Sequence, residues 1–206
     1  MLIGEIQMSL APINYDFGNA SNYSFATTIT CENEDARKMF VEAFGHMLNF
    51  NHEQAIACYT KVTELDSNCA MAYWGIAYCV SSNYNWTPGL GSGFDAIQQA
   101  VALKAGCTEL EQDLIDALAE RHSEEARDAA DPSVLNMGNT PELNAAFAAA
   151  MAPLYKKYKG NLDVAAIYVE ALMNLKAWQL WDKNTETGEI TPADDNTLTC
   201  VQVMED

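Results

Sequence analysis

The sequence predicts an all-α fold in which about eight helices stack as antiparallel pairs. From residue 33 onward, apolar residues recur at steps of three and four, which is the period of helices that bury one face. Short polar or glycine-containing breaks separate these stretches, as expected for helices joined by tight turns. We find no pair of alternating segments around a hairpin turn, so the sequence predicts no β-sheet.

The first 31 residues follow a different pattern. Tyr15 and Phe17 alternate with polar residues, and a second aromatic pair repeats the spacing eight residues later. Alternation of this kind suits a short extended segment whose rings point to one side. We therefore divide the chain into an irregular N-terminal strap, residues 1–31, and a helical domain, residues 32–206. The strap is expected to lie on the helical body.

Each helix is predicted from its apolar stripe and from the residues that begin or end it. Thr140 and Pro141 begin the sixth helix, because a capping residue precedes proline at the first helical position, and Gly160 ends it. The predicted helices cover residues 34–49, 52–65, 69–82, 94–105, 108–121, 140–160 and 162–181, and a last short helix begins near Pro192.

Local features refine these predictions. Thr108 and Glu111 have the spacing of a capping box, in which each side chain bonds a free backbone N–H of the other residue. Pro153 lies inside the sixth helix and is expected to bend or break it. The seventh helix is apolar on nearly every side, which predicts burial between neighbours. Residues 182–191 lack the glutamate and the glycine position of a calcium loop and are predicted to form a polar loop.

Two helix pairs repeat at the 34-residue spacing of tetratricopeptide units. Ala55 and Tyr59 occupy the small and aromatic positions where the helices of a unit cross. Met39 and Tyr73 take the same slot in successive units, and they are 73 − 39 = 34 residues apart. The turn-rich insert at 83–93 accounts for the greater length of the second unit. This spacing predicts an α-solenoid of tetratricopeptide type.

Five short stretches carry a family resemblance: FNHEQAI at 50–56, CAMAYWGIA at 69–77, NYN at 83–85, ALAER at 117–121 and EALM at 170–173. Together they resemble the opening of a family of large tetratricopeptide-repeat proteins. Members of that family have no assigned reaction and are regarded as binding proteins, and the resemblance implies a binding role here. They are also much longer, so the resemblance implies a truncated member of the family.

Charge and composition exclude several function classes. The chain has 29 acidic against 11 basic residues, a net charge of −18, and no cluster of Lys or Arg that could follow a phosphate backbone. Nucleic acids and anionic membranes are therefore disfavoured as partners, and a basic protein or peptide is favoured. No apolar run reaches the roughly 20 residues of a membrane helix. Six cysteines without a C-x-x-C pair predict reduced thiols and a cytoplasmic location.

The predicted function is a protein–protein interaction scaffold, not an enzyme, and it requires no cofactor. In helix pairs of this type, the first helix of each pair lines a concave face. Aromatic and Met side chains with one arginine on that face suit a peptide groove. The side chains predicted to line it are Arg37, Phe40, Phe44, Met47, Met71, Trp74 and Tyr78. The alternative is that residues 1–31 or later helices fill this face, because so apolar a surface seldom stays bare.

Two other interpretations stay open. A metal-assisted hydrolase on the helical scaffold is motivated by His46, His52 and Cys58, which lie close together in the sequence. His52 begins a helix, where its ring packs or bonds locally, so we favour structural roles for these residues and predict no metal site. The last interpretation is a fragment without an independent role.

Overall fold

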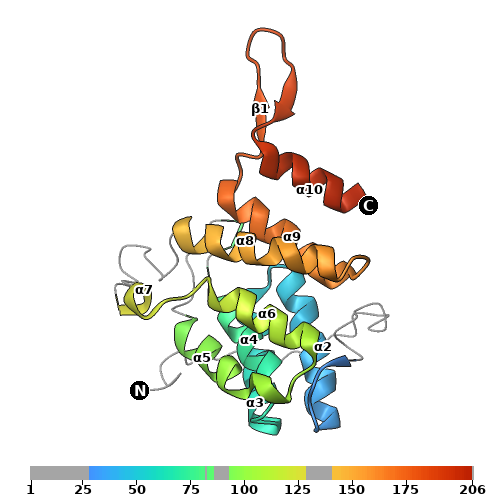
Figure 1. The fold of residues 1–206 in the computed structure, drawn as a ribbon, viewed down its shortest axis with the longest axis vertical. Helices are drawn as coiled ribbons and strands as arrows, with labels where there is room; N and C mark the ends of the chain where they lie inside the picture. Colours follow the sequence, from blue (N-terminus) through green and yellow to red (C-terminus); the bar gives the residue numbers. More distant parts are fainter. Residues whose placement is uncertain (1–27, 82, 86–92, 129–140, 206) are drawn as a thin grey trace.

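The chain folds into a stack of helices with one small β-hairpin at its C-terminal end (Figure 1). The structure is a computed structural model, and it describes residues 28–81, 83–85, 93–128 and 141–205. Most of the predicted strap and most of the glycine-rich insert lie outside these residues. In the described part, no helix combines the length and the apolar character that crossing a membrane requires.

The prediction of a mostly helical chain is confirmed. Each predicted helix has a counterpart within a few residues, except that the seventh is much shorter than expected. The helices are α2 (Glu34–Leu48), α3 (His52–Leu65), α4 (Ala70–Val80), α5 (Phe94–Leu103), α6 (Glu109–Ala119), α7 (Glu124–Asp128), α8 (Pro141–Lys157), α9 (Leu162–Met173) and α10 (Asp195–Glu205). Two 3₁₀ turns, η2 (Lys104–Gly106) and η4 (Asn174–Lys176), extend α5 and α9.

Side chains at the helix starts satisfy backbone N–H groups that have no partner inside the helix. Asn33 accepts from the backbone of α2, and Asn161 accepts from that of α9. The predicted capping box at Thr108 and Glu111 is confirmed, with both reciprocal bonds present. Glu111 also accepts from the backbone N–H and the hydroxyl of Thr30, at 2.7 and 2.6 Å. The described end of the strap therefore lies on the helical body.

The helices pack largely in chain order. Each helix from α2 to α5 contacts the next one along the chain, α6 packs on α5 and α8, and α9 lies between α8 and α10. Figure 1 shows α8 and α9 side by side across one end of the earlier helices, with α10 and the hairpin beyond them. One continuous hydrophobic core runs from Ile29 to Val203 and joins these layers.

Gly75 allows α3 and α4 to pack closely against each other. A Cβ atom added to Gly75 would lie 2.4 Å from Cζ of the Tyr59 ring, a distance that real Cβ atoms do not show. The Tyr59 ring is fully buried and also packs edge-on against Phe40, with ring centroids 5.3 Å apart. The two helices therefore approach as they do because position 75 carries no side chain.

Replacing Gly75 with alanine is expected to lower the free energy of unfolding by about 1–3 kcal/mol, because the added methyl group overpacks the α3–α4 contact. Chemical denaturation of the variant measures the loss. Gly106→Ala is the matched control, because an added Cβ there meets no atom within 4 Å. An equal effect of the two substitutions would contradict the role of this close approach.

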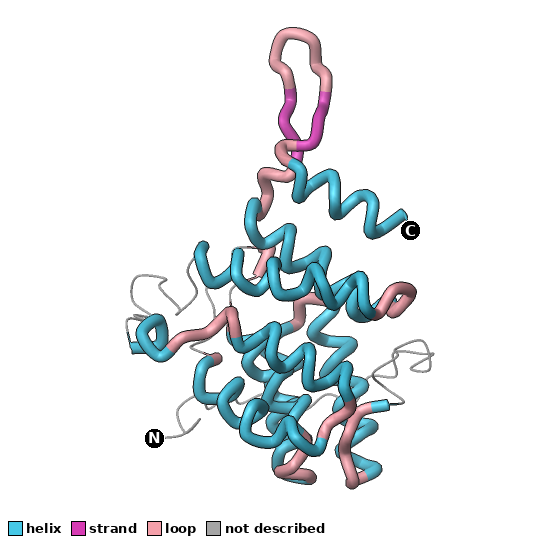
Figure 2. Tube along the Cα trace, in the orientation of Figure 1, coloured by secondary structure: helices cyan, strands magenta, loops and turns pink. Residues whose placement is uncertain are grey.

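The prediction of no β-sheet is wrong at one place. Strands β1 (Trp181–Lys183) and β2 (Ile190–Pro192) pair antiparallel where a polar loop was expected, and Figure 2 shows them projecting from the stack. Asn184 accepts from the backbone N–H groups of Glu186 and Thr187, and Gly188 takes a φ of 73°, so the loop residues close a tight turn. Three-residue strands are too short to reveal the alternation that marks longer ones.

Two helix predictions also need correction. Pro153 does not break α8, which continues to Lys157. The carbonyl that loses its helical bond is that of Ala149, which is exposed, so water can take the place of the missing donor. The seventh helix was expected to reach residue 181, but α9 ends at Met173 and η4 at Lys176. Trp178 then turns the chain with a φ of 61°.

Candidate functional site

The predicted groove is not open. Six of its seven side chains are core residues with at most 1% exposure: Phe40, Phe44, Met47, Met71, Trp74 and Tyr78. Arg37 is partly exposed, and its guanidinium donates to the carbonyl oxygen of Cys31. The six buried side chains have no exposed surface in this structure with which to contact a partner.

Later helices cover the part of the face that α4 contributes, as one of the two alternatives left open by the sequence supposed. The indole of Trp74 donates to the carbonyl oxygen of Leu114 in α6, at 3.1 Å. Tyr78 packs edge-on against Phe147 of α8, with ring centroids 6.2 Å apart, and bonds Glu170 of α9. Hydrophobic area and buried hydrogen bonds are both gained when these helices close over the aromatic residues.

A polar cluster links α4, α8 and α9 with the turn that follows α6. It consists of the buried residues Tyr78, Arg121 and Glu170 and the partly buried residues Asn144 and Asn174. The Tyr78 hydroxyl donates to Oε2 of Glu170 at 2.7 Å. Arg121 follows α6 and is only 1% exposed. Its Cζ lies 5.9 Å from the Tyr78 ring centroid and 5.5 Å from that of Phe147, and its Nε donates to Oδ1 of Asn144 at 2.9 Å.

Burial dominates the electrostatics of this cluster. It raises the pKa of Glu170, although the Tyr78 hydroxyl, the charge of Arg121 and the nearby Asn174 amide act in the opposite direction. Burial likewise lowers the pKa of Arg121. The Oε1 atom of Glu170 and both amide atoms of Asn174 are buried without a partner at hydrogen-bonding distance and angle.

The histidines are buried and neutral near pH 7. Burial lowers the pKa of His52 to about 4 and that of His122 to about 3, and it lowers the pKa of His46 as well. His52 lies 3.4 Å from the amide of Asn83, and His122 packs against the backbone of Gly93. Across the residues that the structure places, no three His, Cys, Asp or Glu side chains lie close enough together to hold a metal ion.

The hairpin presents an apolar surface that sequence reasoning missed. The pairs Trp181–Pro192 and Lys183–Ile190 lie opposite one another, so these four residues share one face, which we call the hairpin face. Trp181 is 52% exposed and Ile190 is 62% exposed. In the sequence, the hairpin is indicated by the turn-forming segment from Asn184 to Gly188, which lies between the apolar residues Trp181 and Ile190. This segment was predicted to be a polar loop.

An exposed aromatic stack lies next to the hairpin in the chain. Trp178 is 69% exposed and stacks on Tyr84, with ring centroids 5.5 Å apart. The positive φ of Trp178 is rare for so bulky a residue. Backbone strain of this kind persists where the surrounding structure requires it.

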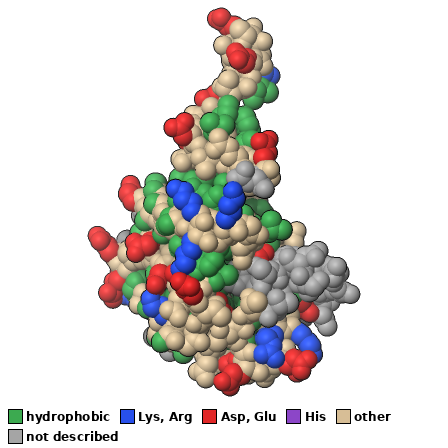
Figure 3. Space-filling view, turned by 45° about the vertical axis from the view of Figure 1, so that its right-hand side comes forward, with side chains coloured by type: hydrophobic (Ala, Val, Ile, Leu, Met, Phe, Trp, Pro, Cys, Tyr) green, Lys and Arg blue, Asp and Glu red, His purple; other side chains and the backbone are tan. Residues whose placement is uncertain are grey.

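Exposed apolar side chains concentrate at this end of the molecule. Among the described residues, eight large hydrophobic side chains are exposed, and five of them follow residue 177: Trp178, Trp181, Ile190, Leu198 and Met204. Figure 3 shows apolar side chains next to acidic ones on the projecting end. This surface, and not the predicted groove, is the exposed binding candidate.

Comparisons of the chain with models of known protein families, with curated proteins and with solved structures find no match in any of the three.

Proposed function

We propose that the chain is a protein-binding scaffold of tetratricopeptide type that binds its partner through the hairpin face. The observation that carries the proposal is the concentration of exposed large apolar side chains after residue 177. Large exposed apolar patches on folded proteins mark interaction surfaces, because water contact with them is unfavourable. The order in which α2 to α5 pack supports the repeat interpretation.

The shape of the hairpin suits binding. It projects beyond the stack (Figure 2), so the helical body does not cover the hairpin face. Trp181 offers a large rigid ring, and tryptophan is enriched among the residues that dominate binding energy at interfaces. Short paired strands hold the ring in place, so little conformational entropy is lost when a partner binds.

The charge of the region indicates the chemistry of the partner. Residues 178–205 contain six acidic side chains and one lysine, a local net charge of 1 − 6 = −5. A partner segment with Lys or Arg beside apolar side chains complements both the charge and the exposed apolar area. A second copy of this chain would bring the same negative charge, so like-charge repulsion disfavours self-association here.

Peptides selected on the full chain from a random display library are expected to combine basic with aromatic or aliphatic residues. Trp181→Ala is expected to weaken their binding by about 2 kcal/mol, roughly thirty-fold, because it removes the central ring. Fluorescence polarisation with a labelled peptide measures the change.

Leu162→Ala is the matched control. Leu162 begins α9 and is 76% exposed, so the substitution removes an exposed apolar side chain away from the hairpin. Its peptide affinity is expected to equal that of the unaltered chain. Equal losses in the two variants, or selection of acidic peptides, would refute the proposal.

A further inference from the structure

The backbone of the hairpin presents hydrogen-bonding groups along its outer edges. In an antiparallel pair of strands, residues that face each other alternate between pairs that exchange hydrogen bonds and pairs whose backbone groups point outward. The backbone N–H of Asn184 donates to the carbonyl oxygen of Glu189 at 2.8 Å, so these two residues form a bonded pair. Counting along β1 from this pair, Lys183 and Trp181 both belong to the second kind. The outer edge of β1 therefore presents two N–H and two carbonyl groups.

The outer edge of β1 is free, whereas that of β2 is interrupted. In the part of the chain that the structure describes, no hydrogen bond uses the outward groups of Trp181 or Lys183, and every residue of β1 is exposed. On β2, one of the two outward positions is Pro192, which has no N–H to donate. β2 also contacts α10. Proline is one of the devices that protect edge strands in native proteins, so the unprotected edge is that of β1.

The side chains along β1 differ on the two faces of the hairpin. Trp181 and Lys183 lie on the hairpin face, and Asp182 lies on the opposite face, because neighbours in a strand alternate. All three residues are exposed. A strand added to β1 would therefore meet an aromatic ring and a cation on one face and an anion on the other.

We propose that the partner binds as a third strand, antiparallel to β1, through the outward backbone groups of Trp181 and Lys183. This inference rests on the protein-binding function proposed above and specifies how the partner is held. In strand addition, main-chain hydrogen bonds supply affinity, and the alternate side chains supply specificity. The antiparallel orientation is favoured because parallel pairing is slightly less stable per residue.

The edge also determines the order of side chains in the partner. From its N-terminus to its C-terminus, an antiparallel segment pairs first with Lys183, then with Asp182 and then with Trp181. Opposite charges, and an aromatic ring beside an aromatic or β-branched residue, stabilise cross-strand pairs. The expected segment is therefore a residue without positive charge, then Lys or Arg, then an aromatic or β-branched residue.

A second copy of the chain fits this edge poorly. Two β1 strands paired antiparallel about their centres would place Asp182 opposite Asp182, and like charges directly opposite each other destabilise a sheet. The net charge of −18 adds to the repulsion. Sedimentation velocity of the chain without peptide is expected to show a monomer. A dimer that dissociates when peptide binds would assign the edge to a second copy and overturn the proposal.

Methylation of the peptide backbone tests the added strand. Peptides selected on the full chain are synthesised again with one backbone N–H at a time replaced by N-methyl. Methylation at the residues opposite Trp181 and Lys183 is expected to weaken binding about ten-fold or more, because it removes a donor to β1. Methylation at the residue between them, whose N–H points away from β1, is expected to change the affinity by less than about two-fold. Fluorescence polarisation measures each peptide.

The outcomes of this series separate the two proposals. Peptide binding without the alternation would overturn the added strand and leave the protein-binding function in place. Failure to select any peptide would overturn both.

A matched pair of substitutions assigns the binding to the edge of β1. Lys183→Pro and Lys183→Ala both remove the lysine side chain, but only proline also removes the outward N–H. Proline is tolerated on edge strands where its nitrogen faces solvent. Only Lys183→Pro is expected to weaken peptide binding about ten-fold, and equal affinities of the two variants would overturn the proposal. The methylated peptides decide the question on the unaltered chain even if Lys183→Pro distorts the hairpin.

Discussion

Replacing Arg121 with methionine is expected to lower the free energy of unfolding by about 3–5 kcal/mol, because it leaves a buried charge without its compensating partner. Glu170 is that charge, and the other buried contacts around it are neutral. Methionine retains most of the aliphatic volume between Tyr78 and Phe147, so the loss reports the charge and its hydrogen bond to Asn144 more than packing. Urea denaturation followed by circular dichroism measures it.

The double variant Arg121→Met with Glu170→Gln identifies the cause. The glutamine side chain introduced by Glu170→Gln would still accept from the Tyr78 hydroxyl but would carry no charge. The double variant is therefore expected to be more stable than Arg121→Met alone. Losses that simply add would show that the two charges do not stabilise each other.

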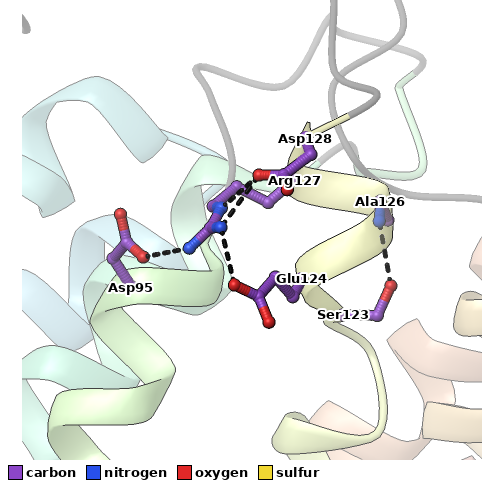
Figure 4. A network of polar contacts seen from close by, with 6 residues as sticks. All are labelled: Asp95, Ser123, Glu124, Ala126, Arg127 and Asp128. Atoms are coloured by element: carbon purple, nitrogen blue, oxygen red, sulfur yellow. Dashed lines mark hydrogen bonds and ion pairs between the residues drawn. The ribbon is translucent and has the colours of Figure 1, made fainter.

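Arg127→Met is the surface control for this experiment. Arg127 pairs with Asp95, Glu124 and Asp128 (Figure 4), and its Cζ lies 5.0 Å from the ring centroid of Phe94. The Arg127 side chain is 30% exposed, so water screens these ion pairs. Its replacement is expected to have a much smaller effect, because exposed ion pairs contribute little to stability.

Replacing Trp74 with alanine is expected to lower the free energy of unfolding by about 3–5 kcal/mol, through lost apolar burial and the cavity that remains. The Trp74 side chain has no exposed surface, and its indole bonds the backbone of Leu114 in α6. It also packs on Tyr78, with ring centroids 5.4 Å apart. Thermal and chemical denaturation measure the change.

Trp181→Ala is the matched substitution at an exposed tryptophan. Because Trp181 is 52% exposed and its strand is short, the variant is expected to unfold at nearly the same denaturant concentration as the unaltered chain. The substitutions at the two tryptophans therefore distinguish an effect on stability from an effect on peptide binding. If Trp74→Ala kept full stability and lost only peptide binding, the groove interpretation would be restored and the description of the core would be wrong.

Periodicity predicted most of the helices because each helix buries one face against the same core. The stripes of α2, α3 and α6 are clear, and the capping box at Thr108 and Glu111 fixes the start of α6. Periodicity did not predict the end of a helix where the pattern of apolar residues gives no information on the length of that helix. α9 is apolar on nearly all sides, so nothing in its pattern marked the end at Met173.

The candidate site was harder to predict, because exposure depends on what packs against a helix. Phe40 and Trp74 have the residue types of a binding groove and also those of a core. Only the positions of α6, α8 and α9 decide between the two. The buried cluster shows the same limit, because Tyr78 and Glu170 are 170 − 78 = 92 residues apart in the chain yet share a hydrogen bond.

The sequence by itself determined the helical class, most helix boundaries, one capping box and the strong negative charge of this protein, because these follow from local periodicity, local side-chain bonds and composition. The tertiary structure alone decided that the aromatic face is covered, that Arg121 and Glu170 are buried together, and that the hairpin face is bare. Burial depends on two surfaces that pack against each other, and the sequence of a single segment describes only one of these surfaces.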